Sequence, residues 1–327
     1  MPKVFINGIS LEETDPVKLR TILRDKIGVS LCFLDIPRYT HLLFYADELI
    51  PVDSTFEYSQ YDEVVKQYKL KPFNYRKVAK CVNIQDTEVV EHVNTYKRYV
   101  LKKAKRDRTI EAVILANCNH PNIIELHELF VYNGELFIIQ DYAPYGDLFE
   151  YIAVKGNDLS NSYNEIIMQV VDGIEYLHSK GYAHLDLKLD NIVIKSINPV
   201  KVALIDFELS YAVPFITDRQ FGTLDYMPPE IAKRSRDKNY IYDKDCDIWT
   251  VGVIILILFH NAQFHPFGST EMEQFRRGTE NPMILRRQPY WPKAIPKKFK
   301  DIAEILFTER EHRPSITQVK QLITQEQ

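Results

Sequence analysis

The clearest hydrophobic periodicity lies in the second half of the chain. The stretch NEIIMQVVDGIEYLHSKG (164–181) places apolar residues three or four apart and ends at Gly181, which predicts an amphipathic helix. The run VGVIILILF (251–259) is apolar on all sides, which predicts a buried helix too short to cross a bilayer. Short buried strands are predicted at ELFIIQDYA (135–143), NIVIK (191–195) and VALID (202–206).

The first half of the chain is richer in predicted strands. Residues 56–142 read as strands, except that a charged stretch at 87–117 predicts one long helix. A strand-rich half followed by a helix-rich half is typical of an α+β protein with two lobes. We expect the first lobe at about 53–143 and the second at about 144–323.

Residues 1–50 predict a small α/β appendage. VFI (4–6) reads as a strand and ETDPVKLRTILRDKIG (13–28) as a helix, and two strand-like runs follow. This order fits a compact β-grasp-like module, somewhat like ubiquitin; the alternative is a helical and extended appendage packed on the main domain. The expected domains are therefore an appended module at 1–52 and a main domain at 53–323.

Composition and charge narrow the class of protein. The 327 residues are 45% hydrophobic and 26% charged, with a net charge of −4, so neither nucleic acid nor insertion into a membrane is expected. The four cysteines are scattered without CxxC spacing, which argues against a disulfide framework or a zinc site. MPKVFINGIS lacks the apolar segment of a signal peptide. We expect an intracellular protein, cytoplasmic or nuclear.

The stretch YAHLDLKLDNIVI (182–194) carries the candidate chemistry. Phosphoryl transfer needs a carboxylate near the acceptor hydroxyl, a cation for the migrating charge and oxygen ligands for magnesium. Asp186 supplies the carboxylate and Lys188 the cation. Asn191, together with Asp206 at the end of a predicted strand, supplies the magnesium ligands.

These residues resemble motifs of eukaryotic-type protein kinases. HLDLKLDN is similar to the catalytic loop HRDLKxxN, and DFE (206–208) to the magnesium-binding motif DFG. The resemblance covers residues 56–323 and implies a two-lobed protein-kinase-like fold. It also implies a serine/threonine kinase that uses ATP and Mg2+ on protein substrates. Further matching motifs are KVAKCV (77–82), IEAVILANCNHPNIIEL (110–126), GTLDYMPPE (222–230), CDIWTVGVIIL (246–256) and HRPSITQV (312–319).

The resemblance assigns roles to individual residues. Asp186 is the catalytic base, Lys188 stabilises the transferring phosphoryl group, and Asn191 and Asp206 hold magnesium. Lys80 grips the nucleotide phosphates, held by an ion pair with Glu111. The other implied nucleotide-binding residues are Val65, Val78 and Val193 around adenine, Asp141 and Ala143 on the connector after the gatekeeper Gln140, and Asp147 at the ribose. The implied structural residues are Asp247, which braces the catalytic loop, His184 near Phe207, and Arg313 paired with Glu230.

The phosphate-binding loop departs from the kinase pattern. Counting back from Lys80 places YSQYDEVV (58–65) where GxGxxGxV belongs, and it contains no glycine. Glycine lets backbone N–H groups approach phosphates closely, so we expect weaker nucleotide binding. Between Lys80 and Glu111 lies the basic run KKAKRDR (102–108), which is either a solvated helix face or a site for an acidic regulatory partner.

Two further departures lie at Leu185 and Glu208, and the first concerns regulation. Leu185 replaces the arginine that would receive an activation-loop phosphate, so the chain resembles kinases that are not switched by such a phosphate. Glu208 replaces the glycine of DFG, which removes backbone freedom beside Asp206.

Three functions are compatible with these residues. The first is an active kinase, because the complete catalytic set is present. The second is a pseudokinase that acts as a scaffold or allosteric regulator, with residues 1–52 recruiting a partner; the glycine-free loop and Glu208 motivate it. The third is a small-molecule phosphotransferase, against which GTLDYMPPE and Arg313 speak because these motifs build a peptide-docking platform.

Overall fold

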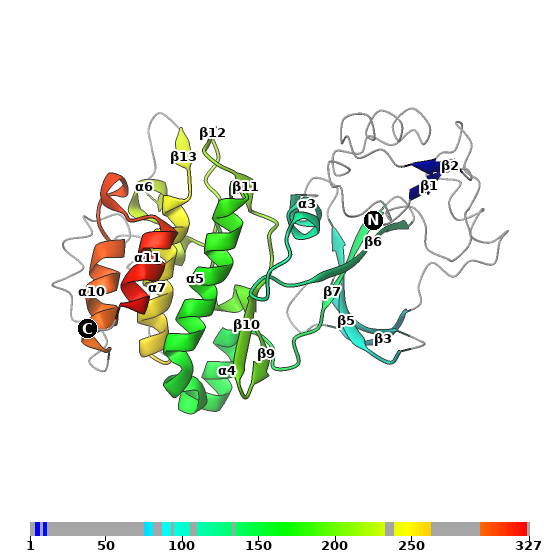
Figure 1. Ribbon diagram of the computed structural model, residues 1–327, viewed down its shortest axis with the longest axis horizontal. Helices are drawn as coiled ribbons and strands as arrows, with labels where there is room; N and C mark the ends of the chain where they lie inside the picture. The colour runs from blue at the N-terminus through cyan, green and yellow to red at the C-terminus, as the bar shows by residue number, and fades with distance from the viewer. Residues whose placement is uncertain are drawn as a thin grey trace. The chain divides into compact units, whose positions relative to one another are not determined.

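A computed structural model describes residues 4–6, 9–11, 75–80, 87–92, 95–104, 110–132, 135–232, 239–262 and 295–325. The chain divides into two compact units (Figure 1). The first comprises Met1–Asn119 and Ile124–Tyr142, and the second comprises His120–Ile123 and Ala143–Gln327. The first unit is built mainly of strands and the second mainly of helices, which confirms the α+β plan.

An antiparallel sheet organises the described part of the first unit. Its strand order is β3-β4-β5-β7-β6, so β3 lies at one edge and β5 near the centre. Val90 and Ile139 are buried on one face of this sheet, where Leu101 and Phe137 pack against them. The strands are β3 (Tyr75–Lys80), β4 (Thr87–His92), β5 (Arg98–Ala104), β6 (Leu126–Tyr132) and β7 (Glu135–Asp141).

The long helix predicted at 87–117 is wrong. β4 and β5 occupy most of this stretch, and only α3 (Ile110–Asn117) is helical. TEVVEH contains one threonine and two valines, and RYVLKKA contains a tyrosine and a valine, all of which favour strands. Tyr96, in the connection between them, has a φ of 57°, so a residue other than glycine adopts the left-handed conformation there. Charged residues within both strands and a glycine-free connection concealed the hairpin.

A short hairpin begins the chain. β1 (Val4–Ile6) pairs antiparallel with β2 (Ile9–Leu11), which confirms the strand predicted at 4–6. The predicted helix at 13–28 and the strand-like runs after it lie outside the described residues. The β-grasp-like module therefore stays a prediction.

Packed helices form the core of the second unit. α5 (Tyr163–Ser179) contacts α7 (Asp245–Phe259) and α11 (Ile316–Thr324), and α10 (Lys297–Leu306) contacts α7 (Figure 1). α5 ends just before Gly181, whose φ of 83° stops the helix as predicted. α7 is buried along nearly its whole length, which confirms the second predicted helix. Within the described ranges, every helix is too short or too polar to cross a bilayer.

Short antiparallel strand pairs flank the loops that carry the candidate chemistry. β9 (Ile192–Ile197) pairs with β10 (Val200–Leu204), which confirms both predicted strands. β8 (Tyr182–Ala183) pairs with β11 (Tyr211–Ala212), and β12 (Phe215–Thr217) with β13 (Tyr240–Tyr242). The remaining helical elements are α4 (Leu148–Lys155), η2 (Gly156–Ser162), η3 (Leu189–Asn191), η4 (Leu224–Tyr226), α6 (Pro229–Ala232) and η5 (Arg310–His312).

Candidate functional site

An ion pair in the first unit joins Lys102 of β5 to Glu111 of α3. The Lys102 Nζ lies 2.8 Å from the Glu111 Oε2, and the two side chains are only 11% and 1% exposed. Glu111 stands in the first turn of α3, where the helix dipole favours a negative charge. The predicted pair between Lys80 and Glu111 is therefore wrong.

The strand order explains this correction. Lys80 ends the edge strand β3, and its backbone aligns with Glu88 of β4. Two strand spacings of about 4.8 Å each separate β3 from β5. The basic run at 102–108 is also reinterpreted, because Lys102 is a buried strand residue and not part of a solvated helix face.

Because Lys102 replaces Lys80 as the candidate lysine, the expected position of the phosphate-binding segment also changes. Lys102 lies 22 residues after Lys80, so the same spacing counted back from Lys102 gives residues 80–87 in place of 58–65. This segment reads KCVNIQDT, links the end of β3 to the start of β4 and contains no glycine. The predicted position 58–65 lies outside the described residues, and its count started from Lys80 in place of Lys102.

The three valines predicted around adenine differ in their placement and exposure. Val193, in β9, is 9% exposed and its backbone bridges to Asp147. Val78 lies on the edge strand and is 43% exposed. Val100 stands two residues before Lys102 and aligns with the gatekeeper Gln140, so it takes the place in the lysine strand that Val78 was given. Val65 lies outside the described residues.

The connector residues already have partners within the protein. The Asp141 carboxylate lies 2.7 Å from the His127 Nε2, and its backbone N–H donates to the Glu125 carbonyl. Ala143 follows at the start of the second unit, and its carbonyl accepts from the Gly146 N–H. These contacts fix the course of the connector chain.

Asp147 caps a helix. Its Oδ1 accepts a hydrogen bond from the Glu150 N–H at 2.8 Å, which makes it the N-cap of α4. Burial raises the pKa of Asp147, and the charge of Asp190 raises it further, although the Glu150 N–H opposes this. Asp147 thus has a structural role beside the ribose contact that the sequence suggested.

The second unit assembles the catalytic loop around Asp186. The side-chain amide of Asn191 donates to the Asp186 carbonyl at 2.8 Å and to its Oδ2 at 3.3 Å. The Lys188 Nζ lies 3.1 Å from the same Oδ2. Thr223 donates its N–H and its hydroxyl to the Asp186 Oδ1, at 2.9 and 2.6 Å, and its hydroxyl accepts from Lys188. The structure thus brings the three predicted loop residues and Thr223 together.

Asp247 braces this loop from α7. Its carboxylate accepts the backbone N–H groups of His184 at 2.8 Å and Leu185 at 2.9 Å, and it lies 2.8 Å from the His178 Nε2. Burial alone would raise the pKa of Asp247. The contact with His178, the nearby His184 and the Leu185 N–H outweigh burial and lower that pKa below its ordinary value. The predicted brace is confirmed.

The apolar Leu185 is accommodated in an apolar cluster. Leu185 has a φ of 63° and is 9% exposed, and its neighbours in this cluster include Met227, Tyr242 and Cys246. The side chain that replaces the arginine therefore packs against the chain after the catalytic loop. Beside it, the His184 ring lies 5.0 Å from the Phe207 ring, as predicted.

Asn191 and Asp206 fit a magnesium site by their chemistry. The backbone N–H of Ile205 donates to the Asn191 carbonyl at 3.0 Å. Because Asp206 directly follows Ile205, this hydrogen bond places the Asp206 backbone close to Asn191. The Asn191 amide nitrogen is used by Asp186, so its side-chain oxygen is the atom suited to a cation. Carboxylate and amide oxygens are the ligands that magnesium prefers.

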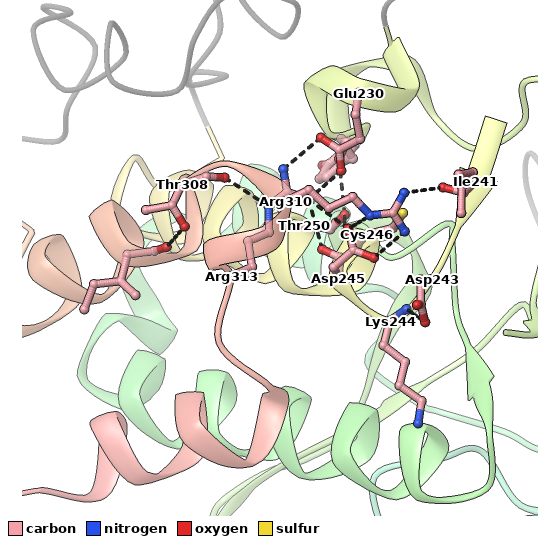
Figure 2. Close-up of polar contacts among 12 residues, drawn as sticks. Glu230, Ile241, Asp243, Lys244, Asp245, Cys246, Thr250, Thr308, Arg310 and Arg313 are labelled. Atoms are coloured by element: carbon pink, nitrogen blue, oxygen red, sulfur yellow. Dashed lines mark hydrogen bonds and ion pairs between the residues drawn. The ribbon is translucent and has the colours of Figure 1, made fainter. Parts of the chain in front are cut away.

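A charge network fixes the segment after the catalytic residues. Arg313 forms a two-pronged pair with Glu230, with its Nη2 2.8 Å from the Oε2, which confirms the predicted pair. Arg310 forms a second such pair with Asp245, at 2.8 and 2.9 Å (Figure 2). Burial raises the pKa of Asp245 to about 6 against the opposing charges of Arg310 and Arg313. The Arg310–Asp245 pair was not predicted from the sequence.

The missed residue Lys102 left a trace in the sequence. RYVLKKA holds a short apolar run, YVL, that ends just before Lys102, and Lys102 stands nine residues before Glu111. A strand interpretation of this stretch would have found it.

Comparisons with known proteins agree with this geometry. A family model described as the protein kinase domain matches residues 74–322. The probable serine/threonine-protein kinase fhkC of Dictyostelium discoideum is 29% identical over 231 residues, which cover 70% of this chain and 38% of that protein. The meiosis-specific serine/threonine-protein kinase MEK1 of Saccharomyces cerevisiae is 34% identical over 195 residues, or 53% of this chain and 39% of that protein. Myosin light chain kinase A of Dictyostelium discoideum is 32% identical over 241 residues, or 69% and 79%. The match thus spans less than half of the first two relatives.

Proposed function

The chain belongs to the protein kinase family, and on that premise we propose that it is an active serine/threonine kinase that uses ATP and Mg2+. The observation that carries the proposal is the set of contacts around Asp186, made by Asn191, Lys188 and Thr223. These contacts orient one carboxylate in a loop that Asp247 braces. A scaffold alone would not require them.

In the proposed reaction, a serine or threonine oxygen of the substrate protein attacks the γ-phosphorus of ATP. The bond from that phosphorus to the β,γ-bridging oxygen breaks, and ADP leaves. The Asp186 carboxylate orients the attacking hydroxyl and accepts its proton, and the Lys188 ammonium stabilises the charge on the migrating group. Thr223 keeps Asp186 and Lys188 in register through its shared hydroxyl.

Lys102 takes the nucleotide role first considered for Lys80. Its ammonium would grip the α- and β-phosphates while Glu111 keeps its side chain in place. Asn191 and Asp206 would hold magnesium, which neutralises phosphate charge when bound. The glycine-free segment 80–87 predicts weaker ATP binding, and a loss of about 1.4 kcal/mol would already be tenfold.

Acidic residues suggest a substrate preference. Asp147 and Asp190 are close enough for the charge of one to raise the pKa of the other. We propose that they favour a basic residue upstream of the target hydroxyl, because a cation relieves this repulsion. A regulatory partner that binds residues 1–52 and an intracellular location, supported by the scattered cysteines, complete the proposal.

A pseudokinase is the second candidate. The same glycine-free segment 80–87 favours it, because side chains there hinder the close approach of backbone N–H groups to phosphates. Such a protein would keep the fold as a scaffold and transfer no phosphoryl group.

A transfer assay separates the two candidates. The purified chain is incubated with labelled ATP, magnesium and generic protein substrates, beside Asp186→Asn and the surface control Asp301→Asn. Transfer by wild type and by the control, but not by Asp186→Asn, supports the kinase. Absence of transfer together with absence of a thermal shift from magnesium–ATP supports the scaffold, and a shift without transfer supports a nucleotide-binding pseudokinase.

A further inference from the structure

Four aromatic rings form a stack on the segment that follows the magnesium motif. We call residues 206–230 the activation segment, and we call Tyr211, Phe215, Phe221 and Tyr242 the aromatic stack. Phe221 and Tyr242 lie 4.2 Å apart between ring centroids at 11°, and Phe215 lies 5.2 Å from Tyr242 at 10°. Tyr211 stacks on Phe215 at 4.7 Å. Near-parallel rings of this kind bind the segment to β13, which carries Tyr242.

The Tyr242 hydroxyl adds directed contacts to this stack. It accepts the Phe221 N–H at 2.9 Å and donates to the Phe221 carbonyl at 3.0 Å. Tyr242 is 2% exposed, and burial raises the pKa of its phenol above the ordinary value. One hydroxyl thus satisfies both backbone groups of Phe221.

The two residues after Phe221, Gly222 and Thr223, both lie against the catalytic loop. Gly222, with a φ of 106°, brings the chain so close that a Cβ there would lie 2.8 Å from the Leu185 carbonyl. Thr223 follows and donates its N–H and hydroxyl to Asp186. The path from the Tyr242 hydroxyl to Asp186 is therefore continuous and short.

The surroundings of this path are apolar. Leu185, Met227 and Tyr242 share one buried cluster, and Phe215 and Phe221 pack against it. Ser210 is fully buried, and its hydroxyl donates to the His184 carbonyl at 3.0 Å. In this arrangement, packing and hydrogen bonds hold the segment at the position where a phosphate and an arginine would otherwise act.

We propose that Tyr242 is a positioning residue: through Phe221 it places Thr223 on Asp186 and assembles the catalytic loop without a phosphate on the activation segment. The proposal rests on the proposed kinase function for its consequence in turnover. The local order that it predicts does not depend on that function.

The test compares Tyr242→Phe with Tyr240→Phe in the full chain. Both residues lie on β13 and are buried, and each variant removes one hydroxyl while keeping the ring. The first readout is amide hydrogen exchange at Phe221 and Thr223, which needs no activity. The second is kcat and KM for ATP, and the third is the activity of wild type after phosphatase treatment.

We expect Tyr242→Phe to speed amide exchange at Thr223 by about tenfold or more. The reason is that Thr223 loses the link to β13 that runs through Phe221 and the Tyr242 hydroxyl. We expect kcat to fall by about tenfold while KM for ATP stays within about twofold, since the nucleotide contacts are untouched. Tyr240→Phe should leave exchange at Thr223 and kcat unchanged, and phosphatase treatment should leave the activity of wild type unchanged.

Three results would overturn the proposal. The first is unchanged exchange at Thr223 in Tyr242→Phe, and the second is an equal loss in Tyr240→Phe, which would mean general packing. The third is loss of activity after phosphatase treatment. If wild type transfers no phosphoryl group, the kinase function fails, and exchange at Thr223 alone still decides whether Tyr242 orders the segment.

Discussion

Replacing Asp247 with asparagine tests the brace of the catalytic loop. The Asp247 side chain is buried, and its carboxylate accepts the backbone N–H groups of His184 and Leu185 and contacts the His178 ring nitrogen. The amide of asparagine offers one acceptor oxygen in place of two, so a buried N–H loses its partner at about 1–3 kcal/mol. Loss of the charge weakens the remaining hydrogen bonds by about 1 kcal/mol each.

Leu185 adds a smaller opposing effect. Its backbone has a φ of 63°, which costs the folded state about 1 kcal/mol. When the contact with Asp247 is weakened, the Leu185 backbone relaxes and the folded state regains this free energy. We therefore expect Asp247→Asn to lower the free energy of unfolding by about 2–4 kcal/mol and the Tm by about 5–15 °C.

Thermal unfolding of wild type and variant measures the effect. The matched control is Asp301→Asn, which removes a carboxylate from the exposed Lys297–Asp301 pair and should shift the Tm by only about 1–2 °C. A Tm shift for Asp247→Asn as small as that of the control would show that the buried carboxylate does not stabilise the catalytic loop.

Asp247, Arg313 and Leu185 each support one further prediction. The pKa of Asp247 lies below its ordinary value of 3.8, so the ionised carboxylate stabilises the fold above pH 3.8. This stabilisation is lost as the pH falls through the pKa of the folded state. In a pH series, the Tm difference between wild type and Asp247→Asn should therefore narrow from pH 6 to pH ~3. Arg313→Lys should lower the free energy of unfolding, measured in urea, by about 2–4 kcal/mol, because lysine cannot make the two-pronged pair with Glu230. A change near zero would contradict this role of Arg313. Leu185→Arg should lower the Tm by about 5 °C or more because it buries a charge in an apolar cluster, whereas Leu185→Met should stay within about 3 °C of wild type; equal Tm values would show that the cluster tolerates a charge.

The residues of the catalytic loop could be predicted from the sequence because they are adjacent. Asp186, Lys188 and Asn191 lie within six positions, and local hydrogen bonds hold them together. α5 and α7 were equally accessible, since their hydrophobic patterns are long and regular. The contacts of Asp247 and Arg313 join residues far apart in the chain, so they came from family resemblance and not from periodicity.

The lysine strand was missed for a physical reason. β5 contains Arg98, Lys102 and Lys103, and a run of charges suggests a solvated helix. A central strand can carry such residues when one pairs with a buried carboxylate, as Lys102 does with Glu111. The glycine-free turn at Tyr96 removed the usual sign of a hairpin. Pairing between strands is not a local property, and so the register of the sheet could not be read from this stretch alone.

We propose that Lys102, and not Lys80, holds the nucleotide phosphates. The most direct measurement compares phosphoryl transfer and magnesium–ATP binding in Lys102→Met and Lys80→Met. We predict that Lys102→Met lowers kcat by about 100-fold or more, because it removes the cation that Glu111 positions, while Lys80→Met stays within about threefold of wild type. Loss of transfer in Lys80→Met with retention in Lys102→Met would show that Lys80 is the phosphate-binding lysine.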